Sequence, residues 1–282
     1  MKRTIVTLAV AFTAGGACAP VARAIEYRLD AGLAAYRWTE HLSYGTPKEQ
    51  GPILVFGGYV SGFPSIAAPA LTVRGDVQVF LGRVNYDTYA QNLSNPALIT
   101  PSSTHSGYVG VRYGGDVGWR FDAGRVAMEP FLGAAYRWWW RYVESDGGAQ
   151  GYPEVYNTVY GRIGLRGEYA LASGMALRGA ASIDPLLWAQ EQIDLTDFAY
   201  IDSGSLVEGQ RVTVKNGLRP GWTIEMGIRQ GNLDVTGYWQ AVRLDESNIV
   251  TCYDSVNPAV RRRCLQPESH QDVIGLKVGF AF

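Results

Sequence analysis

The sequence predicts an all-β fold: a single closed antiparallel β-barrel of about ten strands that crosses a membrane. Long segments alternate apolar and polar residues with the period of two that is typical of β-strands. Short and long connections follow one another in turn along the chain. Charged residues and glycines share the face opposite to the apolar residues, and the segments are longer than the strands of most soluble sandwiches.

The first 24 residues are typical of a cleaved signal peptide. Lys2 and Arg3 form a basic start, residues 5–14 form a short apolar core, and Ala22-Arg23-Ala24 is an A-x-A cleavage site. A core of ten residues is too short to cross a bilayer as a helix. We therefore expect residues 1–24 to be removed.

Residues 25–282 are expected to form one barrel domain, with no second domain. The signal segment carries three basic residues and no acidic one, so a whole-chain balance of 25 basic and 26 acidic residues leaves the mature part acidic by four charges. This balance argues against a nucleic-acid partner. A lipid anchor on Cys18 is a weaker alternative, because Gly15 stands where a large aliphatic residue is normally required.

The ten predicted strands follow one another with few interruptions. They are 25–41, 52–62, 70–87, 105–121, 125–143, 155–171, 174–189, 213–230, 232–245 and 269–282. Tight turns are expected at 122–125, 171–174 and 230–232, and long loops near 42–51, 88–104, 144–154, 190–212 and 246–268. Short turns on one side and long loops on the other are typical of membrane barrels. The stretch 63–69 is long for the short-turn side, and its two prolines prevent it from continuing a strand.

The two faces of each strand can be read from the alternation. In segment 105–121, Val109, Val111 and Tyr113 share one face, and Arg112 and Asp116 share the other. A charged residue on a lipid-exposed face would cost about 2–4 kcal/mol near the bilayer midplane. The apolar face therefore points to lipid and the charged face points into the barrel.

The last strand carries the pattern most clearly. Five apolar residues, ending on the terminal Phe282, alternate with Gly275, Lys277, Gly279 and Ala281. This pattern resembles the closing strand of bacterial outer-membrane β-barrel proteins, in which a C-terminal Phe is an assembly signal. The resemblance implies the outer membrane of a Gram-negative bacterium, both termini in the periplasm, contact with outer-membrane lipids and lipopolysaccharide, and recognition of the last strand by the barrel-assembly machinery.

The candidate functional residues are the charged positions that face the lumen, where basic residues outnumber acidic ones. They are Arg74, Asp76, Arg112, Asp116, Glu129, Arg137, Arg162, Arg166, Glu168, Arg178, Arg219, Glu225 and Arg229. One interpretation is a narrow channel, or small-solute pathway, with a preference for a small anionic solute. The alternative is a lumen filled by ion pairs, in a barrel whose loops serve adhesion or bind a surface partner.

Two cysteines lie in the last predicted loop. Cys252 and Cys264 are expected to form a disulfide, because the compartment after export is oxidising. The run Arg261-Arg262-Arg263 makes this loop basic, and it could bind lipopolysaccharide phosphates or another acidic ligand. The loop could also close the barrel mouth, or its arginines could simply be solvated.

An enzyme is the weakest hypothesis. Ten-stranded outer-membrane barrels include the omptin proteases, whose resemblance would imply an Asp pair facing an Asp-His pair, but the chain has no Asp-x-Asp and no Asp-x-His. His41 ends the first strand and His270 begins the last, close to Glu268, so a rim hydrolase or metal site is conceivable. We expect solvated rim histidines, no catalytic residue, no metal and no cofactor.

Overall fold

The computed structural model of this protein describes most of the chain after the predicted signal peptide. The described residues are 25–43, 45–63, 70–91, 99–145, 151–171, 174–194, 200–202, 205–207, 211–253 and 261–282. Residues 1–24 lie outside the described part, so cleavage after Ala24 stays a prediction.

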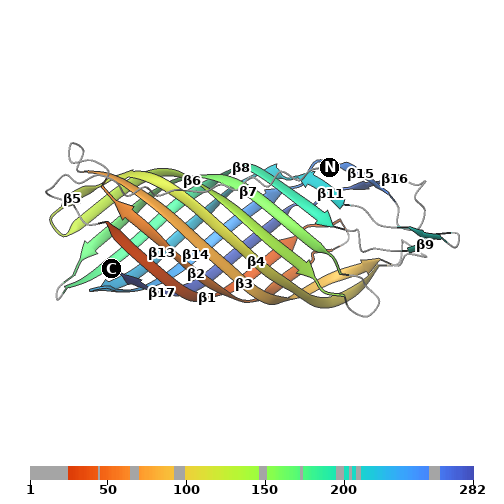
Figure 1. Ribbon diagram of the computed structural model, residues 1–282, viewed down its shortest axis with the longest axis horizontal. Coiled ribbons are helices and arrows are strands. Elements are labelled where there is room, and N and C mark those ends of the chain that lie inside the picture. Colours follow the sequence, from red (N-terminus) through yellow and green to blue (C-terminus); the bar gives the residue numbers. More distant parts are fainter. Residues whose placement is uncertain are drawn as a thin grey trace.

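Ten strand positions close into one antiparallel barrel (Figure 1). Nine are single strands: β1 (Glu26–Glu40), β2 (Lys48–Gly62), β3 (Leu71–Gln91), β4 (Ile99–Trp119), β6 (Val126–Val143), β7 (Pro153–Ala170), β8 (Met175–Asp194), β14 (Leu233–Asp245) and β17 (Ser269–Ala281). The first and last strands close the sheet, with Leu33 opposite Leu276. The predicted fold class is therefore confirmed.

The remaining position is divided into three pieces. β11 (Arg211–Lys215) and β13 (Pro220–Gln230) both pair with β8, whereas β12 (Gly217–Leu218) pairs with β14. The sequence predicted one strand over 213–230. Pro220 has no N–H to donate to a ladder, which is consistent with an irregular backbone at this point.

The two ends of the barrel differ. At one end the chain reverses through tight turns in which Gly124, Gly174 and Gly231 have φ of 62°, 75° and 56°, a region that glycine enters without steric cost. Figure 1 shows the short strand β5 (Phe121–Ala123) and the C-terminus at this end. We call it the turn end.

The opposite end, which we call the loop end, carries short strands beyond the barrel. β9 (Tyr200–Asp202) pairs with β10 (Ser205–Val207), and β15 (Val250–Tyr253) pairs with β16 (Arg261–Cys264). The long strands also reach further than expected, because β2 begins at Lys48 and β4 at Ile99. Parts of the predicted loops 42–51 and 88–104 are therefore strand.

Exposed apolar side chains cover the outer wall of the barrel. They include Leu29, Leu33, Leu54, Phe56, Val77, Val109, Leu132, Ile163, Ile183, Met226, Ile228, Ile274, Leu276 and Phe280. Toward the loop end, the outward positions of the same strands become polar or charged at Arg37, Gln50, Arg83, Arg243 and Asp272. On the adjacent strands β14, β17, β1, β2 and β3 these residues, which we call the polar ring, mark where the apolar belt stops. Residues beyond them lie outside the membrane-spanning segments.

No helix in the described part of the chain has both the length and the apolar character needed to cross a membrane.

Candidate functional site in the barrel lumen

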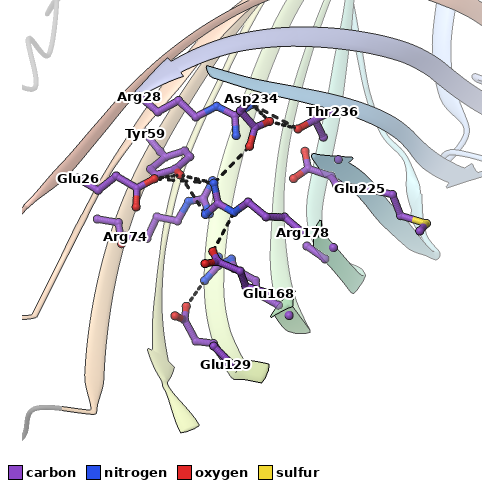
Figure 2. A pocket seen from close by; sticks show the side chains of 18 of the residues that line it. Glu26, Arg28, Tyr59, Arg74, Glu129, Glu168, Arg178, Glu225, Asp234 and Thr236 are labelled. Atoms are coloured by element: carbon purple, nitrogen blue, oxygen red, sulfur yellow. Dashed lines mark hydrogen bonds and ion pairs between the residues drawn. The ribbon is translucent and has the colours of Figure 1, made fainter. Parts of the chain in front are cut away.

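The turn half of the lumen contains a cavity of about 110 Å³, and half of the residues that line it are charged. Figure 2 shows Arg178 at its centre, between Tyr59, Glu168 and Asp234. The guanidinium of Arg178 lies 3.4 Å from both Asp234 and Glu168, and Asp234 also accepts from Arg28 at 2.9 Å. The cavity wall is therefore a network of ion pairs that come from six different strands.

Arg74 also lines the cavity, and an aromatic ring holds its guanidinium. Its guanidinium stacks over the ring of Tyr59, 3.6 Å from the centroid. A cation over an aromatic face is stabilised by the ring quadrupole without a carboxylate contact. Glu225, also in the wall, is paired with Lys277 at 2.9 Å.

A second network fills the lumen nearer its middle. Asp76 accepts hydrogen bonds from Arg112 at 2.5 Å and from Arg162 at 2.6 Å. Arg166 bridges Glu129, at 2.7 Å, and Asp116. Asp76 and Asp116 are each shared by two arginines, including arginines that reach across the lumen from β7, and Glu129 pairs with Arg166. Pairing of this kind is how buried charges are normally tolerated.

The inward glycines make room for these large side chains. A Cβ on Gly279 would collide with the guanidinium of Arg28, and a Cβ on Gly118 would collide with Glu129. A Cβ on Gly110 would meet the ring of Phe80 and the Cβ of Trp139. The glycines therefore serve packing inside a narrow barrel, rather than an open water path.

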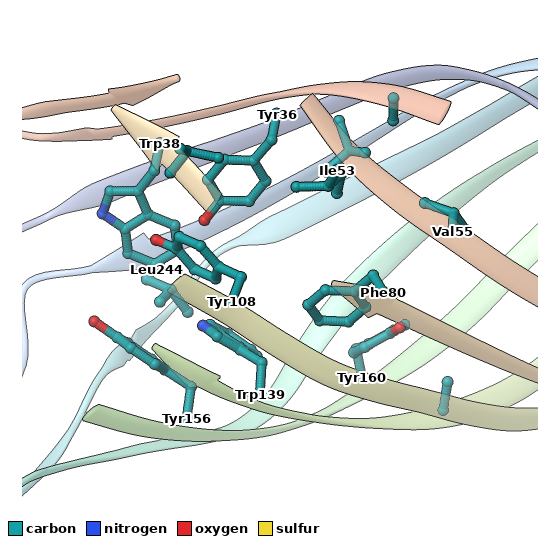
Figure 3. Close-up of a cluster of buried hydrophobic side chains, with 14 of the residues drawn as sticks. Tyr36, Trp38, Ile53, Val55, Phe80, Tyr108, Trp139, Tyr156, Tyr160 and Leu244 are labelled. Atoms are coloured by element: carbon teal, nitrogen blue, oxygen red, sulfur yellow. The ribbon is translucent and has the colours of Figure 1, made fainter. Parts of the chain in front are cut away.

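Toward the loop end, a layer of aromatic residues crosses the lumen (Figure 3). Trp139 is fully buried and stacks on Tyr156, with ring centroids 4.5 Å apart and an interplanar angle of 3°. Trp38 packs edge-on against both rings, and Tyr36 packs against Tyr108 at 4.8 Å. We call this layer the aromatic plug; its members are Tyr36, Trp38, Ile53, Val55, Phe80, Val84, Tyr108, Trp139, Tyr156, Tyr160, Leu186, Leu244 and Val273.

A single arginine pairs with several acids beside the aromatic plug. Arg141, which is 1 % exposed, pairs with Glu49 at 2.6 Å, with Glu154 at 2.5 Å and with Glu40 at 3.7 Å. Ser106 donates a further hydrogen bond to Glu49 at 2.6 Å. These residues form what we call the outer acidic cluster, which lies at or beyond the polar ring of the outer wall.

Glu191 is the fourth acid of the outer acidic cluster and is fully buried. Burial, together with the charges of Glu154 and Glu40, raises its pKa well above the usual range of a carboxyl group. Burial likewise raises the pKa of Glu40 to about 7, although the nearby Arg141 acts in the opposite direction. The cluster therefore holds more carboxyl groups than its one guanidinium can neutralise.

The sequence matches no known protein family and no curated protein. The structure is similar to that of the outer-membrane protease OmpT from Escherichia coli, with a TM-score of 0.58, 11% identity, and coverage of 91% of this chain and 97% of that one. This protein has the fold of the bacterial outer-membrane β-barrels. A looser likeness, with a TM-score of 0.40, 9% identity, and coverage of 94% of this chain and 97% of the other, is to an outer-membrane channel from Pseudomonas putida F1. At these identities the likeness shows the fold alone.

The outer-membrane β-barrel fold brings most of the predicted lumen residues together. Twelve of the thirteen face the interior, ten of them in the networks described above. Of the other two, Arg229 pairs with Glu168 at 2.9 Å, and Arg137 stacks over the Trp139 ring of the aromatic plug, 4.7 Å from its centroid. Arg219 does not, because its guanidinium is 43% exposed at the loop end and pairs with Asp245 and Glu268. The inward orientation predicted for Arg219 was therefore wrong. That prediction assumed an unbroken alternation along residues 213–230, but the strand is interrupted before Pro220.

The sequence interpretation missed the outer acidic cluster. Glu49, Glu154 and Glu191 were assigned to loops 42–51, 144–154 and 190–212, but all three are inward residues at the ends of strands. The sequence did contain a pattern that indicates these inward residues. The alternation of inward Glu154 and Tyr156 with outward Val155 continues from the predicted strand into the predicted loop. These additional acids offset the basic excess that we expected in the lumen.

The arginine run and the two cysteines lie on the β15–β16 hairpin, and their side chains are outside the described part. The backbone register places Cys252 opposite Arg262 and Cys264 opposite Val250. The cysteines are thus diagonal neighbours, whose Cα atoms are typically about 7–8 Å apart, slightly wider than in most disulfides. The disulfide stays a prediction, which peptide mapping after alkylation would check.

The rim histidines lie together on the outer wall. The rings of His41 and His270 are 4.9 Å apart at their centroids, and Nε2 of His270 lies 3.0 Å from a carboxylate oxygen of Glu268. The third histidine, His105, lies on β4, which is not adjacent to β1 or β17 in the sheet. The likeness to OmpT does not extend to an Asp-His motif in this sequence, so it assigns no catalytic residue.

Proposed function

We propose that this protein is a closed, non-conducting outer-membrane barrel that presents its loop end to a surface partner. The observation that carries the proposal is the aromatic plug, whose buried members project into the lumen from most strands of the barrel. The plug separates the cavity of the turn half from the loop end. A ten-stranded barrel is narrow enough for side chains to fill it, and here they do so.

The narrow channel is less well supported by this geometry. The arginines expected to attract an anion are engaged with carboxylates or rings, as for Arg112 with Asp76 and Arg74 with Tyr59. The residues that line the cavity of the turn half include none of the members of the aromatic plug. We place the turn end, with both termini, in the periplasm and the loop end outside the cell, following the usual arrangement of short turns and long loops.

The partner-binding part of the proposal rests on the β15–β16 hairpin. Three consecutive arginines form most of β16, on a ladder that projects beyond the barrel wall (Figure 1). Arginine side chains recognise phosphate, sulfate and carboxylate groups through paired N–H donors. The partner we propose is therefore a polyanionic surface molecule.

Two assays test the proposal. Liposomes that contain the refolded protein should show no swelling in small sugars or amino acids, whereas swelling would restore the channel hypothesis. Separately, whole protein should bind an immobilised sulfated polysaccharide, and the triple change of Arg261, Arg262 and Arg263 to Ser should abolish binding while Arg211→Ser does not. Equal binding by the two variants would remove the hairpin from the proposal.

A further inference from the structure

We propose that His41, His270 and Glu268 form a binding site for a divalent transition metal, of the zinc class, at the seam between the first and last barrel strands. One nitrogen from each imidazole and one carboxylate oxygen all lie within 4.8 Å of one another. Two histidines and one glutamate are a ligand set that zinc takes with a fourth position left for water. The inference is independent of the function proposed above.

The backbone holds these three residues in place. His41 follows β1 directly, and its N–H donates to the backbone carbonyl of Glu268 at 2.9 Å. β1 and β17 are paired up to Glu40 and Ser269, so the ladder fixes the two segments that carry the ligands. The site is therefore built by barrel closure and does not exist in the unfolded chain.

The side chains can reach a shared ion. Tetrahedral zinc holds its nitrogen and oxygen ligands about 3.3 Å from one another, given bond lengths of about 2.0–2.1 Å. Nε2 of His270 and Oε1 of Glu268 are already 3.0 Å apart, and His41 is an exposed side chain that is free to rotate toward them. A small rotation of one exposed ring completes the geometry.

Arg219 is the group that competes with a metal. Its guanidinium bonds the same carboxylate oxygen of Glu268 that faces His270. A metal must displace this contact or use the second carboxylate oxygen. Removing the arginine charge should therefore strengthen metal binding, an effect that a nonspecific histidine contact would not show.

The test is a zinc titration of the refolded full barrel, purified without a histidine tag, against a chromophoric chelator. One zinc per chain is expected. The zinc affinity should fall about tenfold or more in each of three variants, His41→Ala, His270→Ala and Glu268→Gln. Losing a residue that only hydrogen-bonds to a metal ligand already lowers metal affinity by about this much, so losing a ligand should lower it at least as far. His105→Ala should leave the affinity unchanged, and Arg219→Gln should increase it.

Cobalt provides a second readout that does not depend on affinity. Co²⁺ bound to the wild-type barrel should give visible absorption bands that disappear on addition of zinc and are lost in His270→Ala. Each variant should retain the heat-modifiable gel migration of a folded barrel, because these side chains are at the rim. The proposal is overturned by a zinc affinity that is unchanged in His41→Ala and His270→Ala, or by binding that requires His105.

Discussion

At the scale of single residues, Arg141 is the side chain on which the loop half of the lumen depends most. Its guanidinium is the counter-charge for Glu49 and Glu154, and all three side chains are at most 3% exposed. A buried carboxylate that loses its partner has no solvent to replace it. Substitution of Arg141 should therefore destabilise the barrel more than substitution of an arginine at the surface.

We predict that Arg141→Ala lowers the free energy of unfolding by about 3–5 kcal/mol, the cost of breaking a buried ion pair. The measurement is urea unfolding of the barrel in lipid vesicles. Arg211→Ala is the control, because the Arg211 side chain is 50% exposed in its pair with Asp194, and it should cost about 1 kcal/mol or less. Equal effects of the two substitutions would contradict the burial of Arg141.

Glu40 should make stability depend on pH. Its pKa is about 7 in the folded barrel, because of burial, and about 4.5 when unfolded, so between these values the folded state binds a proton that the unfolded state lacks. The contribution of Glu40 to stability is therefore greatest at low pH and is lost as the pH rises through 4.5 to about 7.

Comparison of wild type with Glu40→Gln isolates this contribution. From pH 4.5 to pH 8 the wild type should lose up to about 3 kcal/mol more than the variant, since each pKa unit corresponds to 1.36 kcal/mol. Parallel pH profiles for the two proteins would show that Glu40 is already solvated or ionised in the folded barrel.

At the scale of elements, each strand is defined by what its two faces contact. Leu276 on β17 points to the outside between Leu33 and Gly237 on the neighbouring strands, while Lys277 points inward to Glu225. The same strand therefore requires lipid on one side and a charged network on the other. A one-residue slip would put Lys277 into lipid, which fixes the register.

We predict that Leu276→Arg lowers the free energy of unfolding in bilayers by about 2–4 kcal/mol, the cost of a charge near the midplane. Gln50→Arg, in the polar ring, should cost about 1 kcal/mol or less because it lies at the interface. Unfolding from vesicles of defined thickness measures both. If the two variants are equally stable, the outer wall near Leu276 does not face lipid.

The alternation in the sequence was sufficient to predict the strands, but not their ends. Alternation predicted the faces of Val109 and Arg112 correctly because lipid and lumen impose opposite demands on adjacent residues. It was not followed into the loops, so Glu49 and Glu191 were missed. Sequence alone also could not give the partners of Arg141, since these depend on how far each strand is displaced along its neighbours.

At the scale of the whole molecule, the two halves of the barrel lumen differ in character. The turn half is polar, with a small cavity and arginines shared between carboxylates. The loop half contains the aromatic plug and the outer acidic cluster, which we propose close the lumen. A count of the predicted inward charges favoured a basic pore because it left out the buried rings and acids of the loop half.

The central claim is that the aromatic plug closes the lumen, and single-channel conductance in a planar bilayer tests it most directly. The refolded wild-type barrel should give no steady openings, and a Trp139→Ala/Tyr156→Ala variant, shown to be folded by its gel migration, should conduct because the stacked pair at the centre of the plug is gone. Steady anion-selective openings of the wild type, unchanged in that variant, would contradict the account and return the arginines of the lumen to the role of a pore lining.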